Sequence, residues 1–583
     1  MGKRTSHLWR ELRRRRVVTT AAGYAATAFV LLQLAEIIFP AFGVGEGGLR
    51  VLLAVLLAGF PLTVALSWVF DVTRSGVRVT PPAEGEGDAR VPAPRPLVLG
   101  SVLLMAAGLA WGGWWVVRAA NPADATPEGI RSIAVLPFKD LSEAGDQTYL
   151  GDGLAEEILN RLAGVDSLQV AARTSSFAFR DRNQDVRDIG RQLNVAAVLE
   201  GSLRRSGNHV RITAQLIDAR TGFHLWSQDF DREVDNLFAV QDTVAGAIVR
   251  ELTGHLALPG RAARRPVPPA AQEAYWQARA QLSRRDASVI PQAISLFQQA
   301  VSIDPDYAAA YAGLADSYAL MPVLMQSMAP GEALAQAEQW ARKAIELDST
   351  LADPWASLGL VHALHQDRVE ALDAFARALR LNPSYAPALH WRANVLADMG
   401  QLVPARRDAE KAARLDPLSA SVATDHAAIL FWSGDVEAAG VEVERALDRD
   451  FSYRPAIFLD ALLALEQERE LPLRMSLAQW AVLCGLPSDA VPHLAEAMLA
   501  YRRTGEAASP PPELRGLEPR PGVLSSGTLA ALYALVGDRE QMITWLRRAV
   551  EDGSWAEEYL AVNPIYEPFR GDPEFREIVA ELG

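Results

Sequence analysis

The segment Gly151-Asp152-Gly153 is the first place where the residue types could do chemistry. Glycine-rich turns bind phosphate when they have the spacing G-x-G-x-x-G after a strand, or when they end in the Gly-Lys-Ser/Thr of a P-loop. This segment has neither the third glycine nor the lysine. The better interpretation is the start of a helix over 151–163 with Asp152 as its N-cap. Glu156 and Glu157 then lie in its first turn, where carboxylates complement the helix dipole.

The other chemically capable side chains stand apart from one another in the sequence. His209 and His224 are separated by a predicted strand and lack metal-ligand spacing, while Ser175-Ser176 has no G-x-S-x-G context. The single cysteine, Cys484, has no partner for a disulfide and is expected to be a small buried apolar side chain. We therefore predict that the chain is not an enzyme and has no catalytic, cofactor-binding or metal-binding residues.

The second half of the chain instead predicts binding of a protein or a peptide. The repeat pattern described next places seven side chains on a concave groove, namely Asp316, His390, Asn394, Asp398, Thr424, Phe431 and Trp432. Because no run of Lys or Arg occurs among them, a clamp for a ligand carboxylate is not supported. A peptide with basic or apolar character suits this groove better. For Phe431 and Trp432, burial between repeats is an equal alternative.

A repeat with a period of 34 residues organises the chain beyond its middle. Acidic or Asn residues that end successive units lie at positions 304, 348, 382, 416 and 450, with separations of 44, 34, 34 and 34 residues. A 34-residue period is that of the tetratricopeptide repeat, a pair of helices. The pattern is nearly complete in 352–385, with Trp355, Leu358, Gly359, Ala371, Phe375 and Ala378. We predict an all-α tetratricopeptide-repeat solenoid with a C-terminal cap over 270–583.

An α/β domain is predicted over 130–258. A buried strand over 130–138 is followed by the helix over 151–163, a strand over 168–172 and a helix over 186–193. Three consecutive antiparallel strands follow over 196–205, 210–218 and 223–230, and a helix over 237–252 closes the domain. Within it, Arg173, Glu200 and Asp218 either form a buried polar network or have surface or structural roles.

This domain resembles a known family in several segments that occur in the expected order. They are SIAVLPFKDL (Ser132–Leu141), YLGDGLAEEI (Tyr149–Ile158), ARTSSF (Ala172–Phe177), DVRDIGRQL (Asp185–Leu193), VLEGSLRR (Val198–Arg205), VRITAQLIDARTGFHLW (Val210–Trp226) and FAVQD (Phe238–Asp242). They resemble the TolB amino-terminal-like (FlgO-like) domain of bacterial membrane-anchored tetratricopeptide proteins. The resemblance implies a fold and a compartment. Some relatives carry a winged-helix or nucleotide-cyclase domain before the membrane, for which the 16 residues before the first apolar run leave no room.

Three apolar runs predict three transmembrane helices. The first two lie in 17–70, and the third is 97–117, which is about as long as a bilayer core is thick, roughly 20 residues of helix. Arginines concentrate in a basic tail, 1–16, and in the loop 71–96, which places both in the cytoplasm. The loop is rich in Pro, Gly and charge and is predicted to be disordered. The α/β and repeat domains then lie in the periplasm or outside the cell, on a multi-pass inner-membrane protein.

The charge distribution limits the partners. The first 129 residues carry 13 basic and 9 acidic side chains, which leaves 44 and 62 for the remainder. A basic start suits a lipid bilayer, whereas an acidic body argues against nucleic acid as a ligand. The sequence therefore predicts a multidomain membrane protein that acts as a non-enzymatic scaffold or sensor. The alternative is a signalling subunit coupled to a separate cytoplasmic cyclase or transcription regulator.

Overall fold

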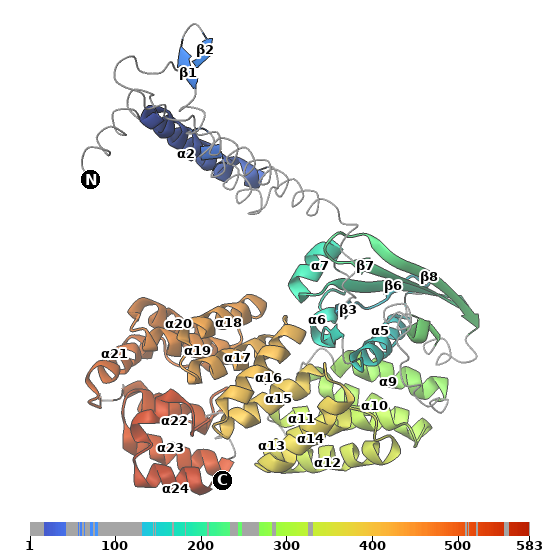
Figure 1. Cartoon of the computed structure of the whole chain (residues 1–583). Coiled ribbons are helices and arrows are strands. Elements are labelled where there is room, and N and C mark those ends of the chain that lie inside the picture. The colour runs from blue at the N-terminus through green and yellow to red at the C-terminus, as the bar shows by residue number, and fades with distance from the viewer. Residues whose placement is uncertain are drawn as a thin grey trace. The chain divides into compact units, whose positions relative to one another are not determined.

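The computed structural model divides the chain into two units, Met1–Glu128 and Gly129–Gly583 (Figure 1). The described residues are 17–41, 56, 59–60, 63, 70–73, 76–79, 131–143, 145, 147–165, 168–180, 182, 184–206, 209–233, 243–247, 267–282, 287–324, 330–507, 510, 512–520, 523–552 and 559–581.

The first unit contains a long helix and a small hairpin. The helix α2 spans Val17–Ala41, and the strands β1 (Phe70–Thr73) and β2 (Gly76–Val79) pair antiparallel, with Phe70 opposite Val79. Most of this hairpin falls in the segment 71–96, for which the composition predicts no folded structure. The rest of that segment lies outside the described residues.

The prediction of three transmembrane helices is wrong. A bilayer-spanning helix needs about 20 consecutive, predominantly apolar residues. Within the described ranges, no helix is both long enough and apolar enough to cross a membrane. The predicted spans over 49–70 and 97–117, like the tail 1–16, lie almost entirely outside the described residues. The fold class of a multi-pass membrane protein and the inner-membrane location derived from it are therefore both corrected.

The second unit begins with a six-stranded sheet. Its strands are β3 (Ser132–Val135), β4 (Lys139–Asp140), β5 (Gln169–Val170), β6 (Ala197–Ser206), β7 (His209–Asp218) and β8 (His224–Glu233). Their order is β5-β3-β6-β7-β8, and β4 also pairs with β6. β6, β7 and β8 are antiparallel neighbours, as the sequence predicts. β3 runs parallel to β5 and β6.

Two details of this sheet differ from the prediction. The strand expected over 130–138 is observed only as β3 and ends before Pro137, because proline has no N–H to donate to a neighbouring strand. β4 begins at Lys139, beyond the expected strand. Of the closing helix expected over 237–252, the structure describes only residues 243–247, which are helical.

Helices cover the two faces of the sheet. α5 (Thr148–Ala163) packs its apolar side on one face, in a core that includes Ile133, Val135 and Leu154. α7 (Val186–Leu193) packs on the other face against Ala134 and Val198. Since successive strand residues point to opposite faces, Ala134 lies on the other side from its neighbours. The short helix α6 (Arg173–Phe177) follows β5.

Beyond Pro269 the chain forms consecutive helix pairs, which give the tetratricopeptide-repeat fold that the 34-residue period predicts. The pairs are α9 (Pro269–Leu282) with α10 (Ile290–Ile303), α11 (Ala308–Leu324) with α12 (Pro330–Leu347), α13 (Asp353–Leu364) with α14 (Arg368–Leu381), α15 (Ala386–Asp398) with α16 (Leu402–Leu415), α17 (Ala420–Trp432) with α18 (Val436–Arg449), and α19 (Arg454–Glu466) with α20 (Glu470–Cys484). We call the first helix of each pair the A helix and the second the B helix.

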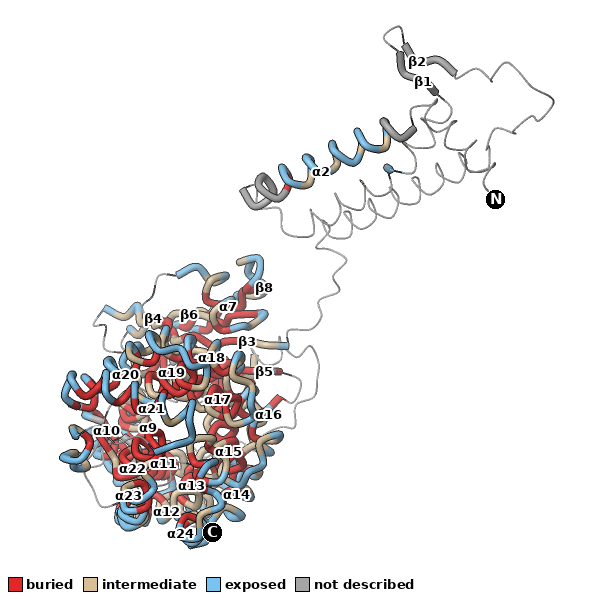
Figure 2. The backbone as a smooth tube through the Cα atoms, turned by 90° about the vertical axis from the view of Figure 1, so that its left-hand side faces the viewer, coloured by how far each residue is buried: buried red, intermediate tan, exposed pale blue. Residues whose placement is uncertain are grey.

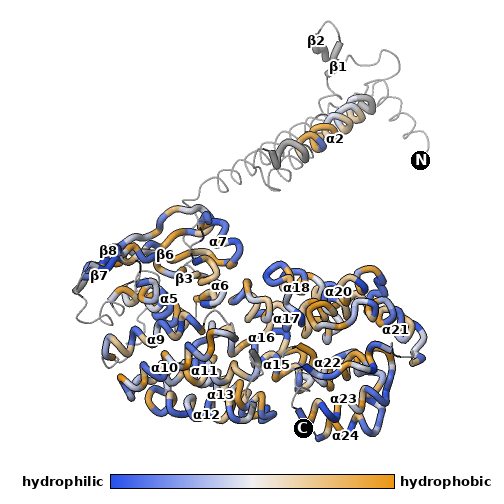
Figure 3. Tube along the Cα trace, turned by 180° about the vertical axis from the view of Figure 1, so that it is seen from behind, coloured by the Kyte–Doolittle hydropathy of each residue, from blue (hydrophilic) through white to orange (hydrophobic). Residues whose placement is uncertain are grey.

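Small residues let the helices of a pair approach closely. A Cβ atom on Gly359 of α13 would lie 2.6 Å from the ring of Phe375 of α14. Ala371 and Ala378 of α14 are fully buried, as the repeat pattern predicts. Buried residues run through the helix pairs in Figure 2, and Figure 3 shows apolar and polar residues alternating along them.

A C-terminal helical region completes the array. It contains α21 (Ala490–Thr504), η3 (Pro512–Gly516), α22 (Ser526–Leu535), α23 (Arg539–Asp552), η5 (Pro564–Phe569) and α24 (Pro573–Glu581). Tyr533, Tyr566 and Phe575 are fully buried in its core, which continues into α17 and α19.

Candidate functional site

The α/β domain contacts the array through α5, and Gly153 of α5 makes this contact possible. Trp276 of α9 is buried in the core of the α/β domain. A Cβ atom on Gly153 would lie 2.3 Å from Nε1 of Trp276, and one on Gly151 would lie 2.4 Å from the carbonyl oxygen of Phe138. The Gly-Asp-Gly segment is therefore a site of close packing.

The interpretation of Asp152 as a helix cap is wrong. α5 already begins at Thr148, with Gln147 at the N-cap position, so Asp152 lies in the second turn of the helix. Its side chain is buried and pairs with Arg180. Burial raises the pKa of Asp152, and the pairing with Arg180 only partly offsets that effect.

A buried ion-pair group, which we call the junction, joins the domain to the array. Glu156 of α5 lies between Arg173 of α6 and Arg279 of α9. Its Oε2 is 3.0 Å from Arg173 Nε, and Arg279 Nε donates a hydrogen bond of 2.7 Å to Oε1. Asp316 of α11 and Asp353 of α13 lie 3.8 and 3.9 Å from the guanidinium of Arg279. Three repeats and the α/β domain thus contribute charges to one group.

The junction favours the charged forms of Glu156 and Arg279. Burial alone favours the neutral form of Glu156, but Arg279 and Arg173 outweigh it, and the pKa of Glu156 falls below its ordinary value. For Arg173 burial is the stronger effect and lowers its pKa. For Arg279 the nearby carboxylates, led by Glu156, overcome burial and raise its pKa.

Hydrogen bonds from the start of α6 form a second contact with the array. The backbone N–H of Ala172 donates to the carbonyl oxygen of Leu415 at 2.6 Å. Ser175 Oγ donates to Asp416 Oδ1 at 2.6 Å and accepts from the N–H of Leu418 at 2.9 Å. Ser175 and Asp416 are both buried. Asp416 is one of the residues that end a repeat, and here it also anchors the α/β domain.

The three residues considered for a polar network in the α/β domain have separate roles. Arg173 belongs to the junction. Asp218 accepts hydrogen bonds from the backbone N–H groups of Arg220 and Thr221 in its own turn. Glu200 lies half-buried in β6, opposite Gln215 of β7.

A small cavity of about 100 Å³ lies between α5, α6 and the A helices at the junction. Glu156, Arg173 and Arg279 line it together with Asp316 and Asp353. Because charges of both signs lie within a few ångströms of one another, the cavity has no single charge to select a ligand.

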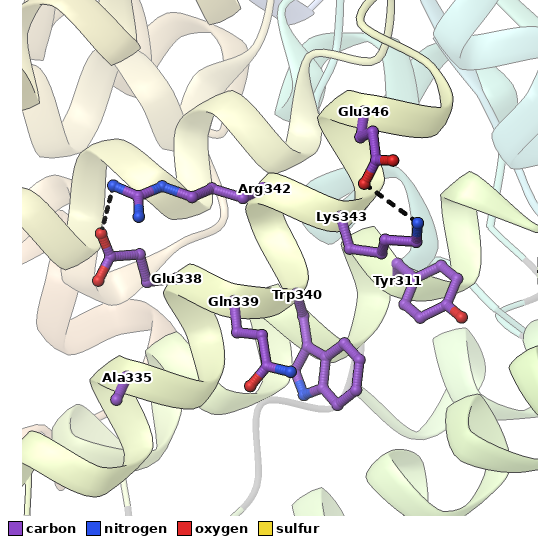
Figure 4. A pocket seen from close by; sticks show the side chains of 8 residues that line it. All are labelled: Tyr311, Ala335, Glu338, Gln339, Trp340, Arg342, Lys343 and Glu346. Carbon is purple, nitrogen blue, oxygen red and sulfur yellow. Dashed lines mark hydrogen bonds and ion pairs between the residues drawn. The ribbon is translucent and has the colours of Figure 1, made fainter.

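A second hollow, of about 550 Å³, lies over α11 and α12 (Figure 4). Its charged side chains pair with each other: Glu338 with Arg342 at 2.6 Å, and Lys343 with Glu346 at 3.1 Å. Tyr311 stacks on Trp340 beside them, with ring centroids 5.6 Å apart. This hollow is wide and its charges are satisfied, so it does not present a specific recognition site.

Three of the predicted groove residues form polar links between neighbouring helices. His390 Nε2 and Asn394 Nδ2, both on α15, lie 2.6 and 2.7 Å from Oδ2 of Asp425 on α17. Asp398, also on α15, accepts a hydrogen bond of 2.6 Å from Arg368 of α14. The structure thus brings His390 and Asn394 together around Asp425, which the repeat phase alone did not identify.

The other four groove residues are dispersed. Asp316 lies at the junction, and Thr424 is buried with its hydroxyl bonded to the carbonyl oxygen of Ala420. Phe431 is buried in the C-terminal core. The ring of Trp432 lies against that of Tyr559, with centroids 4.4 Å apart. Among the described residues no group of three or more His, Cys, Asp and Glu could hold a metal ion.

Comparison with known proteins gives one family match to the α/β domain and several relatives of the chain. Residues 129–247 match the second domain of HilA/YgeH-like transcriptional regulators. The chain is 39% identical over 223 residues to the "Putative adenylate cyclase 3" of Rhizobium meliloti (strain 1021). This match covers 38% of each of the two chains. The chain is 23% identical over 311 residues to the transcriptional regulator HilA of Salmonella typhimurium. This match covers 53% of this chain and 55% of HilA. The chain therefore spans between about a third and just over half the length of these relatives.

Several solved protein structures are similar to parts of this chain. PilF of Pseudomonas aeruginosa is 21% identical and covers 39% of this chain and 97% of its own, with a TM-score of 0.32. YrrB, described as a TPR protein with an unusual peptide-binding site, is 21% identical and covers 32% and 90%, with a TM-score of 0.23. The consecutive helix pairs of the structure themselves give the chain its tetratricopeptide-repeat fold. Membrane anchoring and the TolB amino-terminal-like (FlgO-like) assignment of the α/β domain are not shown.

Proposed function

We propose that the chain is a non-enzymatic scaffold that binds a protein or peptide segment on the A helices of its repeat array. The observation that carries this proposal is the junction, where Glu156, Arg173 and Arg279 fix the α/β domain to the first repeats. Two domains fixed in this way present one continuous surface, so a partner can contact both. Helix-pair repeats bind extended segments along their stacked A helices.

The partner surface centres on Asp425. This carboxylate is 32% exposed although it accepts hydrogen bonds from His390 and Asn394, and Asp398 nearby is 21% exposed. An ordered, partly exposed carboxylate attracts a cationic side chain, so a segment with basic character is the preferred ligand. Phe431 and Trp432 do not contribute, because the C-terminal region covers them.

Absence of catalysis is part of the proposal. The glycines of the Gly-Asp-Gly segment serve packing, and Ser175 and Asp416 bind each other in the interface between domain and array. Nucleotide hydrolysis and cyclisation assays on the purified chain should therefore show no turnover. Turnover that a single substitution in the α/β domain abolishes would contradict this part.

Site-specific photo-cross-linking tests the partner surface. A photoreactive amino acid at Asn394 should give discrete adducts in cells, and Asp425→Lys in the same chain should remove them. The control carries the photoreactive residue at Val403 of α16, which is 77% exposed on a B helix. Equal adducts at both positions, or adducts that persist with Asp425→Lys, would contradict binding at this surface.

A second candidate function is a signalling subunit that acts with a separate cyclase or transcription regulator. It is favoured by the match of residues 129–247 to a domain of HilA/YgeH-like transcriptional regulators, and by the matches of the chain to a protein named as an adenylate cyclase and to HilA. Deletion of the gene should then change cyclic-nucleotide levels or transcription in the source cells. The scaffold proposal does not require either change.

A further inference from the structure

The B helix α20 has two apolar faces. One face packs into the core of the C-terminal region through Leu473, Leu477, Trp480, Ala481 and Cys484. The opposite face carries an exposed stripe, which consists of Leu471, Met475, Ala478 and Val482. Leu471 is 69% exposed, Met475 65% and Val482 75%. A helix of a folded monomer normally exposes polar residues on the side away from the core.

No other B helix in the described part of the array exposes more than one large apolar residue in this way. α14, α16 and α18 each expose a single valine, namely Val369, Val403 and Val441. Single exposed apolar residues are ordinary on protein surfaces, whereas contiguous patches mark interaction sites. The residues of the stripe are separated by 4, 3 and 4 positions, which is the spacing of the seam between two packed helices. The stripe therefore has the form of a helix-docking surface.

We propose that the stripe is a homodimer contact, in which α20 packs antiparallel against α20 of a second copy of this chain. A two-fold axis midway between Met475 and Ala478 places Leu471 of one copy opposite Val482 of the other. It also places Met475 opposite Ala478, so the longer side chain meets the smaller one in both halves. A surface that matches itself under a two-fold rotation is what an isologous dimer requires.

The charges around the stripe are compatible with this pairing. Glu470 and Arg474 pair with each other within α20 at 2.8 Å, so neither needs a partner across the contact. Under the same axis Arg474 faces Gln479, and like charges are not opposed. Gln479 also donates to the carbonyl oxygen of Phe451 at 2.6 Å, which holds this 77% exposed aromatic residue beside α20.

The contact predicts a weak, reversible dimer. One helix pair with its flanking residues buries less than the roughly 1,200 Å² of a standard stable interface. Sedimentation of the full-length chain should therefore show a dimer that dissociates on dilution. Met475→Lys should weaken the dimer about tenfold or more, because the substitution occurs twice at the centre of the contact. Val403→Lys, on the exposed face of α16, should leave it unchanged.

Cysteine pairs test the register. In the double variant Leu471→Cys, Val482→Cys, oxidation should give a covalent dimer. The two positions lie about 16 Å apart along one helix and cannot react within one copy. The single variant Leu471→Cys should not cross-link, because the proposed axis places position 471 opposite position 482 of the other copy. The natural Cys484 is buried and does not provide a partner. A chain that stays monomeric at all concentrations, or cross-links equally in the single variant, would overturn the proposal. Dimerisation that Met475→Lys does not weaken would place the contact elsewhere and overturn it too.

Discussion

Glu156 is the residue on which the junction depends most. Its carboxylate is almost fully buried and is shared between Arg173 and Arg279. Glu156→Gln keeps the size of the side chain but leaves two buried guanidinium groups without their nearest counter-charge. Loss of one partner of a buried ion pair costs about 3 kcal/mol or more, and we expect that loss in urea unfolding of the full-length chain.

A matched exposed ion pair provides the control. Asp185 pairs with Arg187, and both side chains are about half exposed to solvent. Asp185→Asn should leave the unfolding midpoint nearly unchanged, because solvent screens such pairs. If Glu156→Gln were as harmless as Asp185→Asn, the junction would not hold the domain to the array.

The pH dependence of stability follows from the lowered pKa of Glu156. In the unfolded chain this carboxyl titrates near its ordinary value of about 4.3, whereas in the folded chain it titrates lower. The unfolded state therefore binds more protons as the pH falls, and the contribution of Glu156, complete above about pH 5, is lost on acidification. The pKa of Asp152 is raised in the folded chain, so the folded state binds its proton more readily than the unfolded state. Acidification therefore increases the contribution of Asp152 to stability.

The measurement is the slope of the unfolding free energy against pH between about pH 5 and pH 3. The natural chain should lose more stability over this interval than Glu156→Gln, which lacks the titrating group. Parallel slopes for the two proteins would show that Glu156 is not paired in the folded state.

At the scale of elements, the contact between α5 and α9 depends on Gly153. A methyl group there would enter the space of the Trp276 indole, and overpacking of a buried aromatic typically costs about 1–3 kcal/mol. Gly440 of α18 has no atom within 4 Å of where its Cβ would lie. Gly440→Ala should therefore stabilise the chain by up to about 1 kcal/mol through helix propensity, whereas Gly153→Ala should destabilise it. Thermal unfolding of the two variants measures the difference, and shifts in the same direction would contradict the packing described.

The sequence predicts elements well where a local period exists. The alternation of residues 210–218 predicts β7, and the 34-residue recurrence ending at positions 382 and 416 predicts the pairs of the array. The prediction of three transmembrane helices from the length of the apolar runs and their flanking arginines is wrong. Prediction also fails at the start of α5, because the Gly-Asp-Gly segment has the composition of a cap but serves close packing inside the helix.

At the scale of the whole molecule, the joining of domain and array could not be predicted. Glu156 and Arg279 are 123 residues apart, and Ser175 and Asp416 are 241 apart. No periodicity links such pairs. The sequence therefore offers Ser175 without a partner and Arg173 only in a possible network with Glu200 and Asp218, which the structure places elsewhere. For the same reason His390 and Asn394 are predicted as groove residues, while Asp425, which brings them together, is not.

The central claim is that the α/β domain and the repeat array form one fixed scaffold. A double-mutant cycle between Glu156→Gln and Arg279→Gln, measured by urea unfolding of the full-length chain, tests it most directly. Residues in contact across a buried interface show a coupling free energy of about 0.5–3 kcal/mol, and we expect the upper part of that range for this pair. Effects of the two substitutions that add to within about 0.5 kcal/mol would mean that the side chains do not meet, and would contradict the scaffold.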